Sequence, residues 1–68
     1  MKTYQNYTFL SELVERALAS SDLTEIEGIM QSISNAMGWN EGRVYETACY
    51  DAHDIVEEHY HSVEQETK

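Results

Sequence analysis

Apolar side chains recur along this chain with the period of an amphipathic helix in three successive segments. In the first segment the apolar positions are Phe9, Leu10, Leu13, Val14, Ala17 and Leu18. In the second they are Leu23, Ile26, Ile29, Met30, Ile33 and Met37. In the third they are Tyr45, Ala48, Cys49, Ala52, Ile55, Val56, His59, Tyr60 and Val63. The pattern predicts helices over about residues 9–20, 23–37 and 41–64.

Residues that favour helix ends stand between these segments. Thr8 and Asn40 are suitable N-caps for the first and third helices, and Asp22 with Glu25 resembles a capping box before the second. Gly38 stands where a left-handed glycine would end the second helix. The polar ends of the chain, residues 1–7 and 65–68, are expected to be extended or frayed.

The expected fold is a single all-α domain, residues 1–68, in which a helical hairpin packs on a long C-terminal helix. Two short helices are not expected to cover a third helix that is about 36 Å long. A strip of apolar residues in its second half would then stay exposed in a monomer: Ile55, Val56, Tyr60 and Val63. That strip predicts a homodimer or a partner that covers it, and the alternative is a frayed end in a monomer.

The net charge of the chain indicates which classes of molecule it can bind. Among the 68 residues, 13 Asp and Glu face 4 Lys and Arg, and the net charge is −9. Nucleic-acid binding needs basic residues that neutralise phosphates, so direct binding to DNA or RNA is not expected, nor is binding to an anionic membrane. The field favours a basic protein partner. With 41% hydrophobic residues and no proline, the chain is not expected to be disordered.

Cysteine usage and the N-terminal residues favour the cytoplasm. Cys49 is the single cysteine and has no second cysteine in the chain with which to form an internal disulfide. No apolar signal region follows the first residues, and no apolar run approaches the roughly 20 residues that cross a bilayer. We therefore expect a cytoplasmic protein without a membrane anchor.

The third segment carries most of the acidity. From Glu41 onward it holds eight acidic residues against Arg43, if Lys68 is set aside. On a helical projection a group of side chains lies opposite the apolar stripe: Glu46, Tyr50, Asp54, Glu57, Glu58, His61 and Glu64. Carboxylates one turn apart are about 5.4 Å apart along the axis, close to the separation of neighbouring phosphates in a strand. Such a rod would resemble DNA, although a merely solvated helix face explains the same residues.

Catalysis and metal binding have weaker support. Cys49 lies on the predicted core stripe amid negative charge, which favours a buried cysteine over a nucleophile. His53, Glu57 and His61 are four residues apart and share a face, but three ligands on one straight helix rarely close a tetrahedron. Exposed histidines explain them equally well. We predict no enzyme activity, no cofactor and no metal site.

In size and charge the chain resembles small inhibitors carried by phages and mobile elements, many of which imitate DNA. No motif supports that resemblance, which implies a function only by analogy. The leading hypothesis is an acidic helical inhibitor of a basic, nucleic-acid-handling protein such as a nuclease, a CRISPR complex or a restriction enzyme. The acidic residues of the third helix would make the contacts and Tyr50 would anchor them. The alternative is a homodimeric regulatory or accessory protein that uses the apolar strip.

Overall fold

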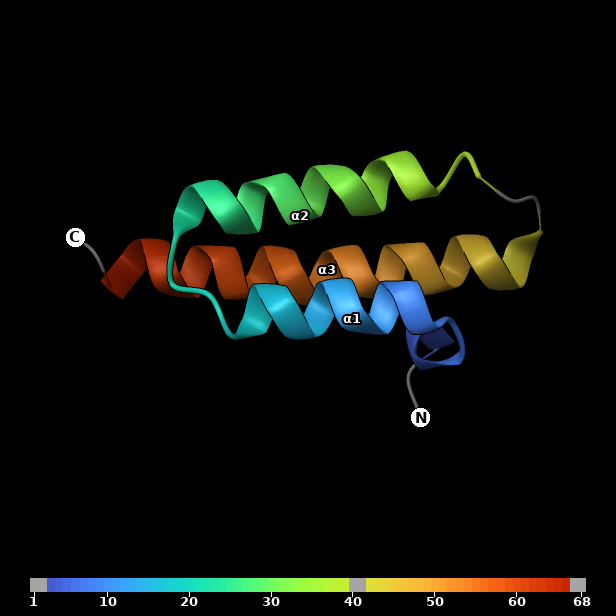
Figure 1. The fold of residues 1–68 in the computed structure, drawn as a ribbon, viewed down its shortest axis with the longest axis horizontal. Coiled ribbons are helices and arrows are strands. Elements are labelled where there is room, and N and C mark those ends of the chain that lie inside the picture. The colour runs from blue at the N-terminus through green and yellow to red at the C-terminus, as the bar shows by residue number, and fades with distance from the viewer. Residues whose placement is uncertain (1–2, 40–41, 67–68) are drawn as a thin grey trace.

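The part of the chain described by this computed structural model, residues 3–39 and 42–66, folds into three α-helices that pack side by side. A short 3-10 helix, η1 (Thr3–Asn6), precedes α1 (Thr8–Leu18), α2 (Leu23–Ala36) and α3 (Arg43–Glu66). The helix α1 runs in the same direction as α3, and α2 runs against both (Figure 1). The predicted all-α fold, with a helical hairpin packed on a long C-terminal helix, is confirmed.

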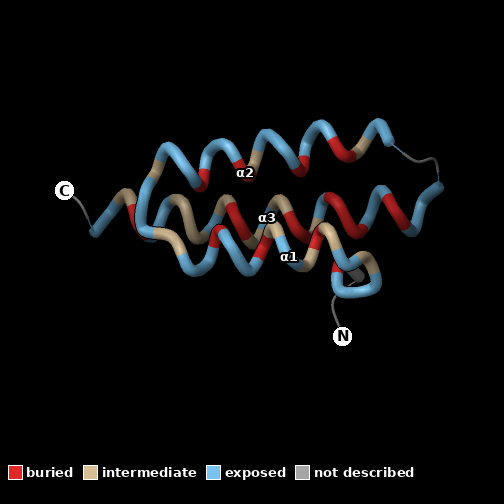
Figure 2. Tube along the Cα trace, in the orientation of Figure 1, coloured by how far each residue is buried: buried red, intermediate tan, exposed pale blue. Residues whose placement is uncertain are grey.

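The inward faces of α1, α2 and α3 form a common core (Figure 2). Its largest fully buried side chains are Leu10, Val14, Ile26, Ile33, Cys49 and Val56. Burial of each Leu, Ile or Val side chain contributes about 1.5–3 kcal/mol to the hydrophobic driving force. The predicted stripes supply this core, with Leu18 as an exception. It lies at the edge of its stripe in the last residue of α1 and stays 46% exposed.

The first residues of the described chain were wrongly predicted to be extended or frayed. Tyr4 is buried, and the Tyr7 N–H donates to the Tyr4 carbonyl over 3.0 Å, which closes the turn of η1. The Tyr7 ring meets the Tyr45 ring edge to face, with centroids 5.2 Å apart. Edge-to-face pairs of this kind are favourable beyond the area they bury. The N-terminal segment is therefore held against α3 by its tyrosines.

The start of α2 is capped by side chains. The Asp22 carboxylate accepts from the Thr24 N–H over 2.9 Å, as an N-cap aspartate does. The Asp22 N–H donates to the Ser20 hydroxyl over 3.1 Å. Asp22 is therefore a cap as predicted, but Ser20 takes the part that a capping box would give to Glu25.

The turn between α2 and α3 differs from the expected one. The helix α2 ends in a tightened turn, in which the Gly38 N–H donates to the Asn35 carbonyl and the Trp39 N–H donates to the Ala36 carbonyl. The backbone of Gly38 is not in the left-handed conformation. The positive φ is at Gly42, at 126°, in a region that favours glycine. The Gly42 carbonyl accepts from Glu46 N–H at the start of α3.

The remaining helix ends differ from prediction by one or two residues, as is usual. The helix α1 begins at Thr8 with Tyr7 as its N-cap residue, so Thr8 is the first helical residue and not the cap. The helix α3 extends to Glu66, two residues beyond its expected end. The predicted cap Asn40 and the predicted start at Glu41 lie outside the described residues.

Candidate protein-binding face

The charged surface of the molecule is built on one unbroken helix. The helix α3 has 24 residues, which corresponds to about 36 Å at 1.5 Å per residue. It carries seven acidic side chains, and Arg43 at its first position is its single lysine or arginine. A continuous rod in this part of the chain is what the sequence predicted.

Packing of the inward side of α3 determines which side chains face solvent. The buried residues of α3 are Tyr45, Ala48, Cys49, Ala52, Val56 and Val63, and they fall on one side of a helical projection. Small side chains at three consecutive inward positions, Ala48, Cys49 and Ala52, let the neighbouring helices approach closely. Because this side is fixed against α1 and α2, the opposite side is left to water.

The outward side carries the residues proposed from the sequence. We call the following set the acidic face: Glu46, Tyr50, Asp54, Glu57, Glu58, His61 and Glu64. The side chains of Glu57 and Glu64 are 46% and 42% exposed, Tyr50 is 53% exposed, and the remaining members are exposed as well. From Glu46 to Glu64 the acidic face extends about 27 Å along the helix axis. The structure thus brings these residues together on one accessible surface.

Histidines contact carboxylates within and beside the acidic face. His53 Nδ1 lies 3.5 Å from Glu57 Oε2, and His61 Nε2 lies 3.8 Å from Glu57 Oε1. His61 Nδ1 lies 3.7 Å from Glu64 Oε1. Pairs this exposed contribute about 0–1 kcal/mol at most, and only when the imidazole is protonated. They leave the face acidic.

The apolar strip proposed as a dimer contact is not an open surface. Val56 is fully buried and Val63 is 4% exposed within the single chain, while Ile55 and Tyr60 are partly buried against the core. The prediction that the strip stays exposed in a monomer is wrong. Both α1 and α2 pack on α3, and the connection between them reaches its second half, where His59 Nε2 lies 2.8 Å from the Ser20 carbonyl. A homodimer stays a prediction, now without an exposed strip to support it.

Cys49 is a core residue, as predicted. Its side chain is fully buried, and burial raises the pKa of the thiol, an effect that a hydrogen bond with Tyr45 partly opposes. A raised pKa reduces the thiolate fraction, and the thiolate is the reactive form. The position therefore has the chemistry of a structural cysteine.

Two apolar residues near the α2–α3 turn are exposed to solvent. Trp39 is 65% exposed, and its ring centroid lies 5.7 Å from that of Phe9. Val44 is 61% exposed. A helical projection already separates Val44 from the stripe, because it lies about 100° from its neighbour Tyr45. For Trp39, which lies beyond the end of α2, the periodic pattern contains no signal.

Comparison of the chain with protein-family models, curated proteins and solved structures finds no match. None of the described helices combines the length and the apolar character that a membrane crossing requires.

Proposed function

We propose that this protein binds a basic, nucleic-acid-handling protein through the acidic face and inhibits it by imitating DNA. The observation that carries the proposal is the row of outward carboxylates over about 27 Å of α3, with no lysine or arginine between Glu46 and Glu64. The class of target we propose is a nuclease, a CRISPR complex or a restriction enzyme. The setting is the cytoplasm, and the protein would be a phage or mobile-element factor that blocks such a defence.

Electrostatics would govern the association. A groove that binds nucleic acid is lined with Lys and Arg that replace the counterions of phosphates. A rigid helix with carboxylates at successive turns offers such a groove a comparable line of negative charge. Complementary fields of this kind accelerate encounter and suppress binding to acidic proteins, and salt weakens them.

Tyr50 would supply the apolar part of the contact. Its ring is 53% exposed and lies between the first carboxylate of the acidic face, Glu46, and Asp54. Tyrosine is enriched among the residues that dominate binding energy at protein interfaces. We therefore assign Tyr50 the role of an anchor within an otherwise charged surface.

The same charges do not help the fold. Like charges at i, i+3 or i, i+4 destabilise a helix by about 0.2–0.5 kcal/mol per pair, and Asp54 has such partners in Glu57 and Glu58. A solvated face with alternating charge would avoid that penalty. The retention of these acids on α3, with no lysine or arginine between Glu46 and Glu64, is more readily explained by a binding role than by stability.

Two matched charge-neutralised variants test the proposal. The first carries Glu46→Gln, Asp54→Asn, Glu57→Gln and Glu58→Gln on the acidic face. The second removes the same number of exposed acids from α1 and α2, with Glu12→Gln, Glu15→Gln, Glu25→Gln and Glu27→Gln. Wild-type protein and both variants are immobilised and exposed to host lysate, and proteins released by salt and by duplex DNA are identified.

The proposal predicts that a basic nucleic-acid-binding protein is retained by wild-type protein and by the α1–α2 variant. The α3 variant should lose it, because position on α3 matters and net charge alone does not. Equal retention by all three proteins would assign binding to another surface. If no protein is released by salt or DNA, the acidic face is only solvated and the proposal is wrong.

A further inference from the structure

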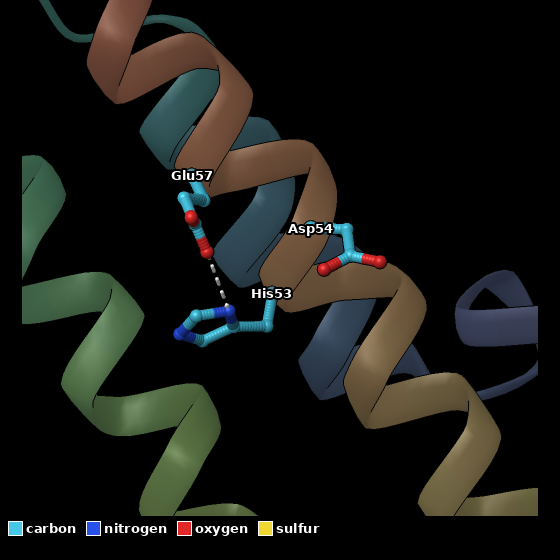
Figure 3. A group of neighbouring side chains, drawn as sticks. All are labelled: His53, Asp54 and Glu57. Atoms are coloured by element: carbon cyan, nitrogen blue, oxygen red, sulfur yellow. Dashed lines mark ion pairs between the residues drawn. The ribbon is translucent and has the colours of Figure 1, made fainter.

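Three side chains with metal-binding atoms converge at the edge of the acidic face, to which two of them, Asp54 and Glu57, belong. His53, Asp54 and Glu57 each offer one such atom, and these three atoms all lie within 4.8 Å of one another. His53 and Glu57 point toward each other across one turn of α3, with Nδ1 and Oε2 3.5 Å apart (Figure 3). Asp54 projects from the neighbouring position and turns one carboxylate oxygen toward the pair (Figure 3).

This donor set suits a particular class of ion. One imidazole nitrogen with two carboxylate oxygens matches Zn²⁺ and similar divalent transition metals, whereas Mg²⁺ and Ca²⁺ prefer oxygen ligands alone. Zn²⁺ holds such atoms at about 2.0–2.2 Å, so the three atoms would draw together slightly around it. The carboxylates have exposed, adjustable side chains, and His53 is held more firmly because its side chain is only 26% exposed.

The other histidines of α3 lack this convergence. An imidazole binds an ion through one ring nitrogen, and the two nitrogens of His61 lie near different carboxylates, Nε2 near Glu57 and Nδ1 near Glu64, so His61 forms no group of three donor atoms with them. His59 Nε2 is engaged with the Ser20 carbonyl. The geometry therefore distinguishes His53 from two chemically identical neighbours on the same helix.

We propose that His53, Asp54 and Glu57 bind Zn²⁺ or a similar divalent transition metal, with water in the remaining coordination positions. Three ligands from one turn of one helix leave at least one position of a tetrahedron open, as in metal sites that take an exchangeable ligand. The negative field of α3 favours any cation, and the imidazole makes the site selective for a transition metal. This site goes beyond the proposed function and does not depend on a protein partner.

The test is calorimetric titration of the full chain with ZnCl₂ at pH 7.5. His53→Ala should weaken binding at least tenfold, and Glu57→Gln should do likewise, since each removes one of three ligands. His61→Ala is the matched control and should change the dissociation constant less than twofold. Circular dichroism verifies that each variant keeps its helices.

Three results would overturn the proposal. The first is equal weakening by His53→Ala and His61→Ala, or no weakening by either, which would show that the three atoms do not act together. The second is binding of Mg²⁺ as tight as that of Zn²⁺, which would show attraction to negative charge without a coordination site. The third is absence of any heat of binding when the protein is titrated with Zn²⁺ up to millimolar concentration.

Discussion

The inward and outward faces of α3 differ in what the fold requires of them. On the inward face nearly every side chain is determined by packing against α1, α2 and η1, and Tyr45 and Val56 leave almost no surface to water. On the outward face Glu57 and Glu64 lie near the imidazoles of His53 and His61, and the side chains are open to water. The stability of the fold therefore explains the inward face, whereas the outward face is open to selection for binding.

The largest expected effect comes from a charge placed on the inward face. Val56→Asp would bury a carboxylate without a partner, at a cost of several kcal/mol, and a domain this small has only about 3–5 kcal/mol from its core. We expect the variant to be unfolded by circular dichroism at 25 °C. Thr47→Asp adds the same side chain to the exposed side of α3 and should keep a cooperative melt. A folded Val56→Asp protein would contradict the burial described above.

A smaller effect is expected from a single hydroxyl. The Tyr45 hydroxyl donates to the Ala36 carbonyl in the core, and Tyr45→Phe removes that hydrogen bond while the same carbonyl still accepts from the Trp39 N–H. We expect a loss of about 0.5–1.5 kcal/mol, which lowers Tm by about 4–8 °C per kcal/mol in a domain of this size. Tyr50→Phe on the outward face should leave Tm unchanged. Equal shifts for the two variants would remove the distinction between the faces.

Neutralising one outward acid should act in the opposite direction. Asp54→Asn removes repulsion with Glu57 and Glu58, so we expect stability to rise by about 0.4–1 kcal/mol at low salt. The gain should shrink at about 1 M salt because exposed charges are then screened. Urea unfolding of both proteins at the two salt concentrations measures this change in the free energy of unfolding. A loss of stability at low salt would mean that Asp54 supports the fold and that its charge needs no functional explanation.

The smallest effect concerns pH and Cys49. Burial raises the pKa of its thiol in the folded chain, so the folded state holds this proton more tightly than the unfolded state does. The contribution to stability is complete below the unfolded value of about 8.5 and is lost as pH rises toward the folded value. Urea unfolding between pH 8 and 10 should show a steeper decline for wild-type protein than for Cys49→Ala. Parallel declines would contradict this assignment.

Much of the fold follows from periodicity, because residues that share a helix face are buried together. Cys49 was placed in the core by its spacing alone, and Asp22 was recognised as a cap by its position before Leu23. Tyr4 and Tyr7 were missed because two aromatic residues three positions apart among polar ones have no clear period. The Tyr7 ring packs against Tyr45, which lies far away in sequence.

The periodic pattern also does not predict how the helices are positioned along one another. Length alone suggested that α1 and α2 cannot cover α3, whereas their connection reaches the second half of α3 at His59. The candidate face was predictable because it is simply the side opposite the stripe. The convergence of His53, Asp54 and Glu57 was not predicted, because sequence spacing gives the turn on which a side chain lies and not its rotamer.

The most direct test of the DNA-like role is competition for the partner that the acidic face retains. Labelled duplex DNA is bound to that partner at about 0.1 M salt, and wild-type protein or the α3 variant is then titrated in while fluorescence anisotropy is followed. We predict that wild-type protein displaces the DNA completely and that the variant with Glu46→Gln, Asp54→Asn, Glu57→Gln and Glu58→Gln does not. A ternary complex of partner, DNA and wild-type protein would show that the acidic face does not occupy the nucleic-acid groove.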